Sequence, residues 1–565
     1  MAFAVGGVLL GNAACTDLDE TVYSQLTSEN IDLTNPTDLS QLLGGAVANY
    51  RYLMNSWDAF MIMTEMSTDI QMIPSRPGVG WGAQYINLHK HNWTRENAAL
   101  GASWTFSYQG ISYCNQVLDA MGEETAENAE MMAHTRFFRA LFYYHLFDTF
   151  RNVPLQTTQV FEPGYLPEQQ GPEAVYNFIV DELKAIKDKI GEPTYYGFGD
   201  KYVVNMLLAK MYLNKNAWFG TQDPKNYEDC LAELESIIAG GHYSLAPKYL
   251  DNFQENLNSC PETIFCIPQD RTHTAQCTWQ SYWFPQSGLE AYASTAAGYN
   301  GAAAVPQFIK SYDEADQRLG WTWAYGPQSK GVKNADGTYS FNSGDPIQFT
   351  DDDWAGQGVL NYNVECHSID NPGAFQQEGA RLHKFYIIPG ENQGTTATDI
   401  VVFRYADVLM MKAECLLRLG RDEATAAELV TQVRNRAFSS ASKATRTAAD
   451  LKGGSVYGYG HDEYTDETYN SWSSHITTYE GGSDIELGGL LDDLGWEFAG
   501  EFHRRQDLIR FQVTGGGSVY NRKSWFCKDA TTENYWNVYP IPNDAMLANI
   551  KLVQNEGYGG AIAAE

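Results

Sequence analysis

Two stretches of the chain mix aromatic and hydrogen-bonding side chains with many glycines and prolines. The first spans residues 69–91 and the second residues 278–323. A sugar ring has an apolar C–H face and a belt of hydroxyl groups, so its site needs aromatic planes and polar side chains. Both stretches supply that combination. The candidate binding residues are Asp69, Arg76, Trp81, Tyr85, Asn87, Trp279, Trp283, Tyr299, Asn300 and Trp321.

Each candidate tryptophan has an alternative role as a packing residue of the core. Trp81 stands between Gly80 and Gly82, where little local structure is present to bury it. Tyr299 lies in a turn flanked by glycines, which let the backbone approach a ligand closely. We therefore expect Trp81 and Tyr299 to contribute stacking surfaces to one groove, although they lie far apart in the sequence.

Signals for an enzyme are weak. The chain contains no G-x-S-x-G, H-E-x-x-H or phosphate-loop motif. The run of Asp351, Asp352 and Asp353, together with Glu365, offers paired carboxylates of the kind that glycosidases use, but a solvated acidic turn is the favoured interpretation. The sequence therefore predicts a protein that is not an enzyme and binds no cofactor. The Asp run is also a weak signal for a structural calcium ion, and although Ala355 breaks the calcium-loop pattern, the sequence leaves that question open.

The nine cysteines fall into groups with different expected roles. Cys260, Cys266, His273 and Cys277 match no common zinc spacing, so no metal site is predicted. In an exported protein a disulfide among the three cysteines is favoured, with the pairing open. Cys230 and Cys415 lie on apolar helix faces and are predicted to be buried free thiols.

The N-terminal segment resembles an export signal. Residues 1–14 are apolar and end in Ala13-Ala14, directly before Cys15 and a polar continuation. Such a run is too short to span a bilayer but suits a signal peptide, and small residues before a cysteine are typical of bacterial lipoproteins. We expect lipidation of Cys15. The alternative is an ordinary apolar N-terminus with a buried cysteine, since no basic residue precedes the run and Asn12 is unusual there.

Composition limits the partners. The 565 residues include 70 Asp and Glu against 38 Lys and Arg, a formal net charge of −32. Phosphate backbones and anionic membrane surfaces repel so acidic a protein, so we expect no nucleic-acid partner and a membrane contact only through the lipid. Aromatic residues make up 13% of the chain, including 14 Trp and 35 Tyr, which favours sugar ligands.

Apolar residues recur at helical spacing in segments separated by short glycine-containing turns. Such helix pairs bury their apolar faces only by stacking, as tetratricopeptide repeats do. The segment 125–150 is apolar on most sides and is expected between neighbours. The predicted helices span residues 98–121, 125–150, 172–190, 201–219, 227–239, 398–419, 422–437 and 490–511.

The periodicity is lost in the middle of the chain, where short strands and a hairpin turn at residues 334–337 are predicted. The fold class is mainly α, a helix-pair scaffold with an irregular lobe containing short strands. The expected organisation is a signal peptide (1–14), an N-terminal helical scaffold (15–243), a ligand-binding lobe (244–398), and C-terminal helical repeats with a tail (399–565), the last carrying a surface insertion at 439–483.

Several segments resemble one family. Residues 404–414 (RYADVLMMKAE), 495–510 (GWEFAGEFHRRQDLIR) and 539–542 (YPIP) with 549–558 are similar, in this order, to signatures of the SusD-like (RagB/SusD) nutrient-uptake lipoproteins of the outer membrane. Residues 136–141 with 153–155 match an early helix of the family, and residues 298–301 match a mid-chain turn in which Trp often replaces Tyr299. The departures are the insertion after Phe438, this exchange and the weak lipoprotein signal.

The resemblance implies a SusD-like fold anchored by lipid to the outer face of a Gram-negative outer membrane. It implies capture of an oligosaccharide or polysaccharide for a SusC-like TonB-dependent transporter. Two alternatives remain open at this point: a surface glycoside hydrolase, and capture of peptides or glycopeptides by the same scaffold.

Overall fold

The computed structural model describes residues 36–559, apart from 57, 77–78, 192–196, 273, 275–278, 352–355, 371–372, 391–396, 466–471 and 473. The expected signal peptide and Cys15 lie outside these residues. Helices dominate, as predicted. The long helices are α1 (Pro36–Asn55), α4 (Ala98–Met121), α5 (Ala129–Phe150), α6 (Pro172–Ile186), α7 (Lys201–Phe219), α8 (Pro224–Gly240), α12 (Tyr405–Leu419), α13 (Glu423–Arg434) and α16 (Gly488–Phe498).

Short helices connect and cover the long ones. The α-helices are α2 (Phe60–Glu65), α3 (Ala83–His89), α9 (Trp279–Trp283), α10 (Pro306–Lys310), α11 (Arg318–Thr322), α14 (Ala441–Ala444), α15 (Ala448–Lys452), α17 (Arg504–Arg510), α18 (Val519–Arg522) and α19 (Asn543–Ala548). The 3₁₀ helices are η1 (Tyr249–Phe253), η2 (Gln286–Tyr292) and η3 (Asn534–Asn537).

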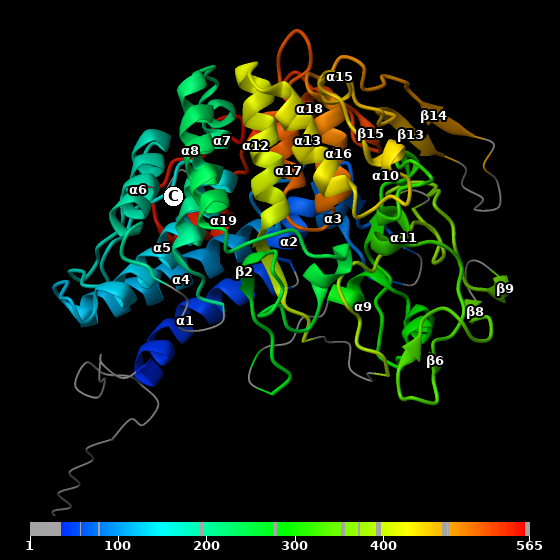
Figure 1. The fold of residues 1–565 in the computed structure, drawn as a ribbon, viewed down its shortest axis with the longest axis horizontal. Helices are drawn as coiled ribbons and strands as arrows, with labels where there is room; N and C mark the ends of the chain where they lie inside the picture. The colour runs from blue at the N-terminus through cyan, green and yellow to red at the C-terminus, as the bar shows by residue number, and fades with distance from the viewer. Residues whose placement is uncertain are drawn as a thin grey trace, which may run out of the picture.

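The helices from α4 to α8, continued by α12 and α13, form a stack in which each packs against the next (Figure 1). Helix α5 is buried along nearly its whole length, which confirms the prediction from its apolar sides. Its closest neighbour is α4, because a Cβ at Gly110 would lie 2.1 Å from Cζ of Phe142. A glycine is therefore required where the two helices cross.

Local sequence sets the ends of the stacked helices. The carboxylates of Asp200 and Asp223 accept backbone N–H bonds at the starts of α7 and α8. Gly220 and Gly420 end α7 and α12 in the left-handed conformation that glycine adopts without strain. These are the turns that the sequence predicted between the members of each helix pair.

The lobe is built from two-stranded antiparallel ribbons. The predicted turn at residues 334–337 joins β6 (Val332–Lys333) to β7 (Tyr339–Ser340). The other ribbons pair β1 (Gln71–Met72) with β3 (Ala303–Ala304), β4 (Trp323–Ala324) with β11 (Arg381–Leu382), β5 (Gly326–Pro327) with β10 (Asn361–Tyr362), β8 (Gln348–Asp351) with β9 (Gly356–Val359), and β2 (Thr263–Ile267) with β12 (Ile400–Arg404). Because β1 pairs with β3, the stretch 69–91 lies with the lobe.

Two predicted helices are corrected by the structure. Residues 400–404 form β12 and pair with β2, because this β-branched segment is suited to a sheet. The predicted helix 490–511 is two helices, α16 and α17. Between them Phe502 has a positive φ, and its N–H donates to the buried carboxylate of Glu65 at 2.7 Å, which breaks the helix.

The segment 439–483 is more than a surface insertion. It contributes α14, α15, β13 (Gly460–Tyr464) and β14 (His475–Thr477), and β13 also pairs in parallel with β15 (Trp525–Phe526). The side chains of Tyr457 and Tyr459 are buried and donate hydrogen bonds to Asp69, to its carbonyl and its carboxylate. This insertion therefore supports the core as well as covering it.

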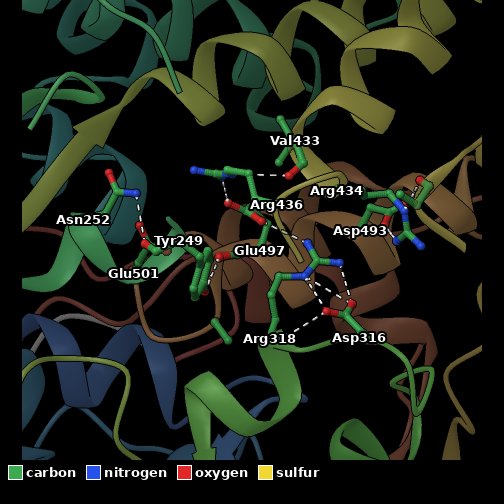
Figure 2. A network of polar contacts seen from close by, with 12 residues as sticks. Tyr249, Asn252, Asp316, Arg318, Val433, Arg434, Arg436, Asp493, Glu497 and Glu501 are labelled. Carbon is green, nitrogen blue, oxygen red and sulfur yellow. Dashed lines mark hydrogen bonds and ion pairs between the residues drawn. The ribbon is translucent and has the colours of Figure 1, made fainter. Parts of the chain in front are cut away.

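A buried ionic network fastens the lobe to the helices. Arg318 and Arg436 lie on either side of Glu497 in α16 (Figure 2). Glu497 also pairs with Arg404 at 2.8 Å, and Arg404 reaches Glu262 at 2.8 Å. Burying these charges costs desolvation free energy. Removing one member of the network is nevertheless destabilising, because it leaves its partner as an unpaired buried charge. Within the described residues, no helix combines the length and apolar character needed to cross a membrane.

Candidate functional site

Tyr299 is an exposed aromatic residue on a firmly held loop. Its side chain is 52% exposed. The backbone N–H groups of Tyr299, Asn300 and Gly301 donate to the carbonyls of Ser281, Phe284 and Tyr282 at 2.7, 3.0 and 2.7 Å. The loop is thus fixed against α9 and the residues that follow it, while the phenol ring faces solvent.

The buried side chain of Trp81 packs against the backbone of this loop. Its indole Nε1 donates to the carbonyl oxygen of Tyr299 at 3.0 Å, across 218 residues of sequence. A Cβ at Gly301 would lie 2.4 Å from the Trp81 ring, and Tyr85 packs edge-on against the same ring. Trp81 itself is only 8% exposed. The two residues lie together as expected, but Trp81 packs beneath the loop and offers little stacking surface.

Two buried polar side chains complete the support. Arg76 donates to the carbonyls of Gly301 and Glu378 at 3.2 and 3.0 Å and to that of Phe375. Asn300 has a φ of 49° and accepts from Arg381 at 2.8 Å. Burial lowers the pKa of the Arg76 guanidinium well below its ordinary value, because neutral carbonyls replace water around it. Asn tolerates this left-handed conformation better than most non-glycine residues, which suits it to a tight turn.

Hydrogen-bonding groups lie beside the Tyr299 loop. Gln376, next to Asn300, is half-buried. On the Trp81 side, the Gln84 amide donates to Asp58 at 3.3 Å, and burial raises the pKa of the Asp58 carboxyl. An exposed aromatic ring on a loop that also bonds an amide can stack on one sugar face, while the amide binds the sugar hydroxyls.

Trp321 lies elsewhere, in a cavity of about 480 Å³ between the lobe and η1. Its ring stacks on Tyr249 with centroids 5.9 Å apart. Tyr325 and Phe341 are partly exposed at this cavity. Polar lining comes from Gln254, Gln328, Asn342 and His383. The cavity combines aromatic planes with amides and is a second place where a sugar could bind.

The other candidates are occupied by contacts within the protein. Asp69 is fully buried and forms a two-bond ion pair with Arg504, both distances being 2.7 Å. Trp279 is 2% exposed, and Trp283 is buried with its indole N–H on Gln71 at 3.2 Å. These three residues therefore have structural roles in the core. The residues that bury them come from segments far away in the sequence, so the local pattern did not indicate their burial. Tyr85 is also buried, and Asn87 is half-buried on α3.

The remaining chemical expectations concern carboxylates and cysteines. Asp352, Asp353, His273 and Cys277 lie outside the described residues, and Glu365 is ion-paired with Lys310 at 2.7 Å. In the part of the chain that is described, no three His, Cys, Asp or Glu side chains gather as a metal site would require. Cys260 carries a free thiol, but the disulfide among the three cysteines stays a prediction because Cys277 lies outside the described residues, whereas Cys230 and Cys415 are buried free thiols as predicted.

Sequence reasoning missed the rest of the Trp321 cavity. Tyr325 lies between β4 and β5 and Phe341 directly follows β7, in a region without a clear alternating pattern, so nothing in the sequence marked their rings as exposed. Gln84 and Asp58 were also missed. A signal was present for Gln84, which lies two residues after the Gly80-Trp81-Gly82 segment.

Comparisons with known proteins agree with one another. A model described as "SusD family" matches residues 248–558, and one described as "Starch-binding associating with outer membrane" matches residues 18–177. The starch-binding protein SusD of Bacteroides thetaiotaomicron is 25% identical over 491 residues, covering 80% of this chain and 78% of that protein. The SusD-like protein P2 of Formosa agariphila is 22% identical, covering 98% of each.

Solved structures show the same fold. A SusD superfamily protein from Parabacteroides distasonis superposes with a TM-score of 0.66 at 19% identity, over 94% of this chain and all of that one. The surface glycan-binding protein A of Bacteroides thetaiotaomicron, solved with laminarihexaose, gives 0.62 at 18% identity, over 92% and 99%.

Proposed function

This chain belongs to the SusD family, and from that premise we propose that it is a cell-surface carbohydrate-binding protein that delivers its ligand to a SusC-like TonB-dependent outer-membrane transporter. Its relatives are named for starch and glycan binding, and none of the names given above describes an enzyme. Its role is therefore to hold a glycan without altering it.

The Tyr299 loop is the observation that carries the proposal. Four side chains, Arg76, Trp81, Asn300 and Arg381, are buried around a loop whose one exposed ring is Tyr299. Packing of the core does not require the loop of an exposed tyrosine to be held so firmly. A rigid aromatic plane, in contrast, loses little entropy when a sugar stacks on it.

The proposed location is the outer face of a Gram-negative outer membrane, with attachment through lipid on Cys15. The support is the family, the Ala13-Ala14-Cys15 pattern and the charge of −32, which disfavours direct contact with anionic headgroups. Several acyl chains on one cysteine hold a protein firmly to a bilayer. Mass spectrometry of the protein from its native membrane tests this, since an unmodified Cys15 or retention of residues 1–14 contradicts it.

Affinity gels and a glycan array test the ligand class. The panel should include soluble starch and laminarihexaose, with a peptide control. Retardation by a glycan without new reducing ends is the expected result. Steady release of reducing ends would favour the hydrolase alternative, and binding confined to peptides would favour peptide capture.

A further inference from the structure

The cavity beside Trp321 is lined mainly by aromatic and aliphatic side chains. Its volume is about 480 Å³. The aromatic and aliphatic side chains that form its walls include Tyr292, Trp321, Tyr325, Phe341, Leu250 and Ile387. Ligand sites in proteins commonly have this size and this apolar character. The cavity therefore suits a ligand that has an apolar part.

The aromatic walls are held in place and still keep exposed surface. The ring of Trp321 stacks on that of Tyr249 with planes 22° apart. The ring centroids of Tyr292 and Phe341 are 5.3 Å apart. Tyr325 and Phe341 are nevertheless 42% and 43% exposed. Because the rings are ordered, another ring can stack on them with little further loss of side-chain entropy.

The two basic side chains of the lining offer no positive charge to a ligand. The Nζ of Lys384 donates to the carbonyls of Glu497 and Ala499 at 3.1 and 3.0 Å, and to the carboxylate of Glu501. His383 is buried, and burial lowers its pKa, so this ring is neutral. These groups therefore favour a neutral ligand.

The ring nitrogens of His383 are also engaged within the protein. Its Nε2 donates to the carbonyl of Gly320 at 2.9 Å. Its Nδ1, which is 3.0 Å from the hydroxyl oxygen of Tyr292, therefore accepts from that hydroxyl. The histidine thus has no proton left to donate to a ligand.

The amides of the lining are largely engaged as well. The Gln328 side chain donates to the carbonyls of Tyr325 and Gly326 at 3.3 and 2.9 Å. The Gln254 side chain donates to the carbonyl of Leu250 at 2.7 Å. A sugar ring needs several hydrogen-bond partners for its hydroxyls. A sugar alone would therefore find few donors inside this cavity.

A polar group remains at the mouth of the cavity. Asn342 is exposed, directly follows Phe341 and lines the same cavity. Its Oδ1 accepts from the backbone N–H of Ser329, which leaves the NH₂ of this amide to donate to a ligand. The cavity therefore combines an apolar interior with a donor at its edge.

We propose that the cavity binds the aromatic group of an aryl-substituted sugar, with the ring inside and the sugar at the mouth beside Asn342. The inference rests on the proposed function for the sugar part of the ligand. A cavity of about 150 Å³ with apolar walls holds a benzene ring, so the ring fits with room to spare. Offset and edge-on contacts between rings favour an aromatic group over an aliphatic one.

The test uses three probes that share one sugar: phenyl, cyclohexyl and methyl β-D-glucoside. Their Kd values are measured by calorimetric or NMR titration of the full-length protein. Gly320→Phe adds a ring at the cavity wall, where a Cβ meets open space. Gly44→Phe, at an exposed helix position where a Cβ also meets open space, is the matched control. Tyr325→Ala, which removes an exposed ring from the cavity, is the second variant.

The wild type should bind phenyl glucoside about tenfold more tightly than methyl glucoside and about threefold more tightly than cyclohexyl glucoside. Gly320→Phe should lose this preference and Tyr325→Ala should weaken it, whereas Gly44→Phe should keep it. Melting temperatures and affinity for the glycan of the array should stay at wild-type values.

Equal affinity for phenyl and methyl glucoside would overturn the proposal, because the cavity would then not select an apolar group. Equal affinity for phenyl and cyclohexyl glucoside would contradict the aromatic class. Retention of the phenyl preference in folded Gly320→Phe and Tyr325→Ala variants would place the ring elsewhere and would also overturn it. Failure to bind any array glycan, with the phenyl preference intact, contradicts the proposed function instead.

Discussion

The indole of Trp81 and the backbone of Tyr299 form a single unit, in which a 3.0 Å hydrogen bond links a buried ring to the carbonyl of a residue whose own ring is exposed. The two residues have opposite roles. Trp81 sets the position of the loop, and Tyr299 offers its surface. Substitutions at the two positions should therefore have different effects.

Trp81→Ala should lower both stability and glycan affinity. Removing a buried tryptophan typically costs about 3–5 kcal/mol, and the Tyr299 carbonyl loses its donor. Trp81→Phe should keep most of the stability but weaken glycan binding through loss of the N–H. Urea unfolding and calorimetric titration measure the two quantities. Wild-type stability of Trp81→Ala would show that the ring does not support the loop.

Gly301→Ala tests the close approach of loop and ring directly. The new Cβ would lie 2.4 Å from Trp81, so one of the two must move. Overpacking of this kind costs about 1–3 kcal/mol. A lower melting temperature and weaker glycan binding are expected, whereas Gly80→Ala, where a Cβ meets open space, is the matched control. Equal behaviour of the two variants would contradict the geometry.

Glu497→Gln should destabilise the protein strongly. The carboxylate pairs with Arg318, Arg404 and Arg436, and these cations hold its pKa far below the ordinary value despite burial. Removing one partner of a buried pair typically costs about 3–5 kcal/mol. Chemical unfolding measures this cost. A change below about 1 kcal/mol would mean that the network does not fasten the lobe to α16.

Buried histidines predict a contribution to acid sensitivity. Burial lowers the pKa of His89 to about 3, and neither ring nitrogen has a hydrogen-bond partner in the described structure. The unfolded chain takes up this proton near pH 6.5, so stability from a neutral His89 is present above that pH and is lost as pH falls toward 3.

His89→Leu isolates this effect. Between pH 7 and pH 5 the wild type should lose about 2 kcal/mol more stability than the variant, as pH-dependent urea unfolding can show. The comparison is necessary because Glu65 and Asp492, whose pKa values burial raises to about 7, change stability in the opposite direction over this range. Identical pH profiles would show that the pKa of His89 does not differ between the folded and the unfolded chain.

The sequence predicted the helix stack because apolar spacing and glycine turns are local signals. It also singled out residues 404–414 and 495–510, whose importance is structural: Arg404, Glu414, Glu497 and Arg510 are buried in ion pairs. It did not predict which aromatic rings face solvent. Exposure of Tyr299 and burial of Trp81 depend on contacts between segments far apart in the chain, as does the pairing of Asp69 with Arg504.

The central claim is that Tyr299 forms the stacking surface for a glycan. The most direct measurement is the Kd of Tyr299→Ala for the glycan of the panel that binds the wild type most tightly, with the 83% exposed Tyr479→Ala as control. Loss of a stacked aromatic at a binding hot spot costs about 2 kcal/mol or more. Tyr299→Ala should bind more than tenfold more weakly with a nearly unchanged melting temperature, and Tyr479→Ala should bind as the wild type does. Wild-type affinity in a folded Tyr299→Ala variant would contradict the account.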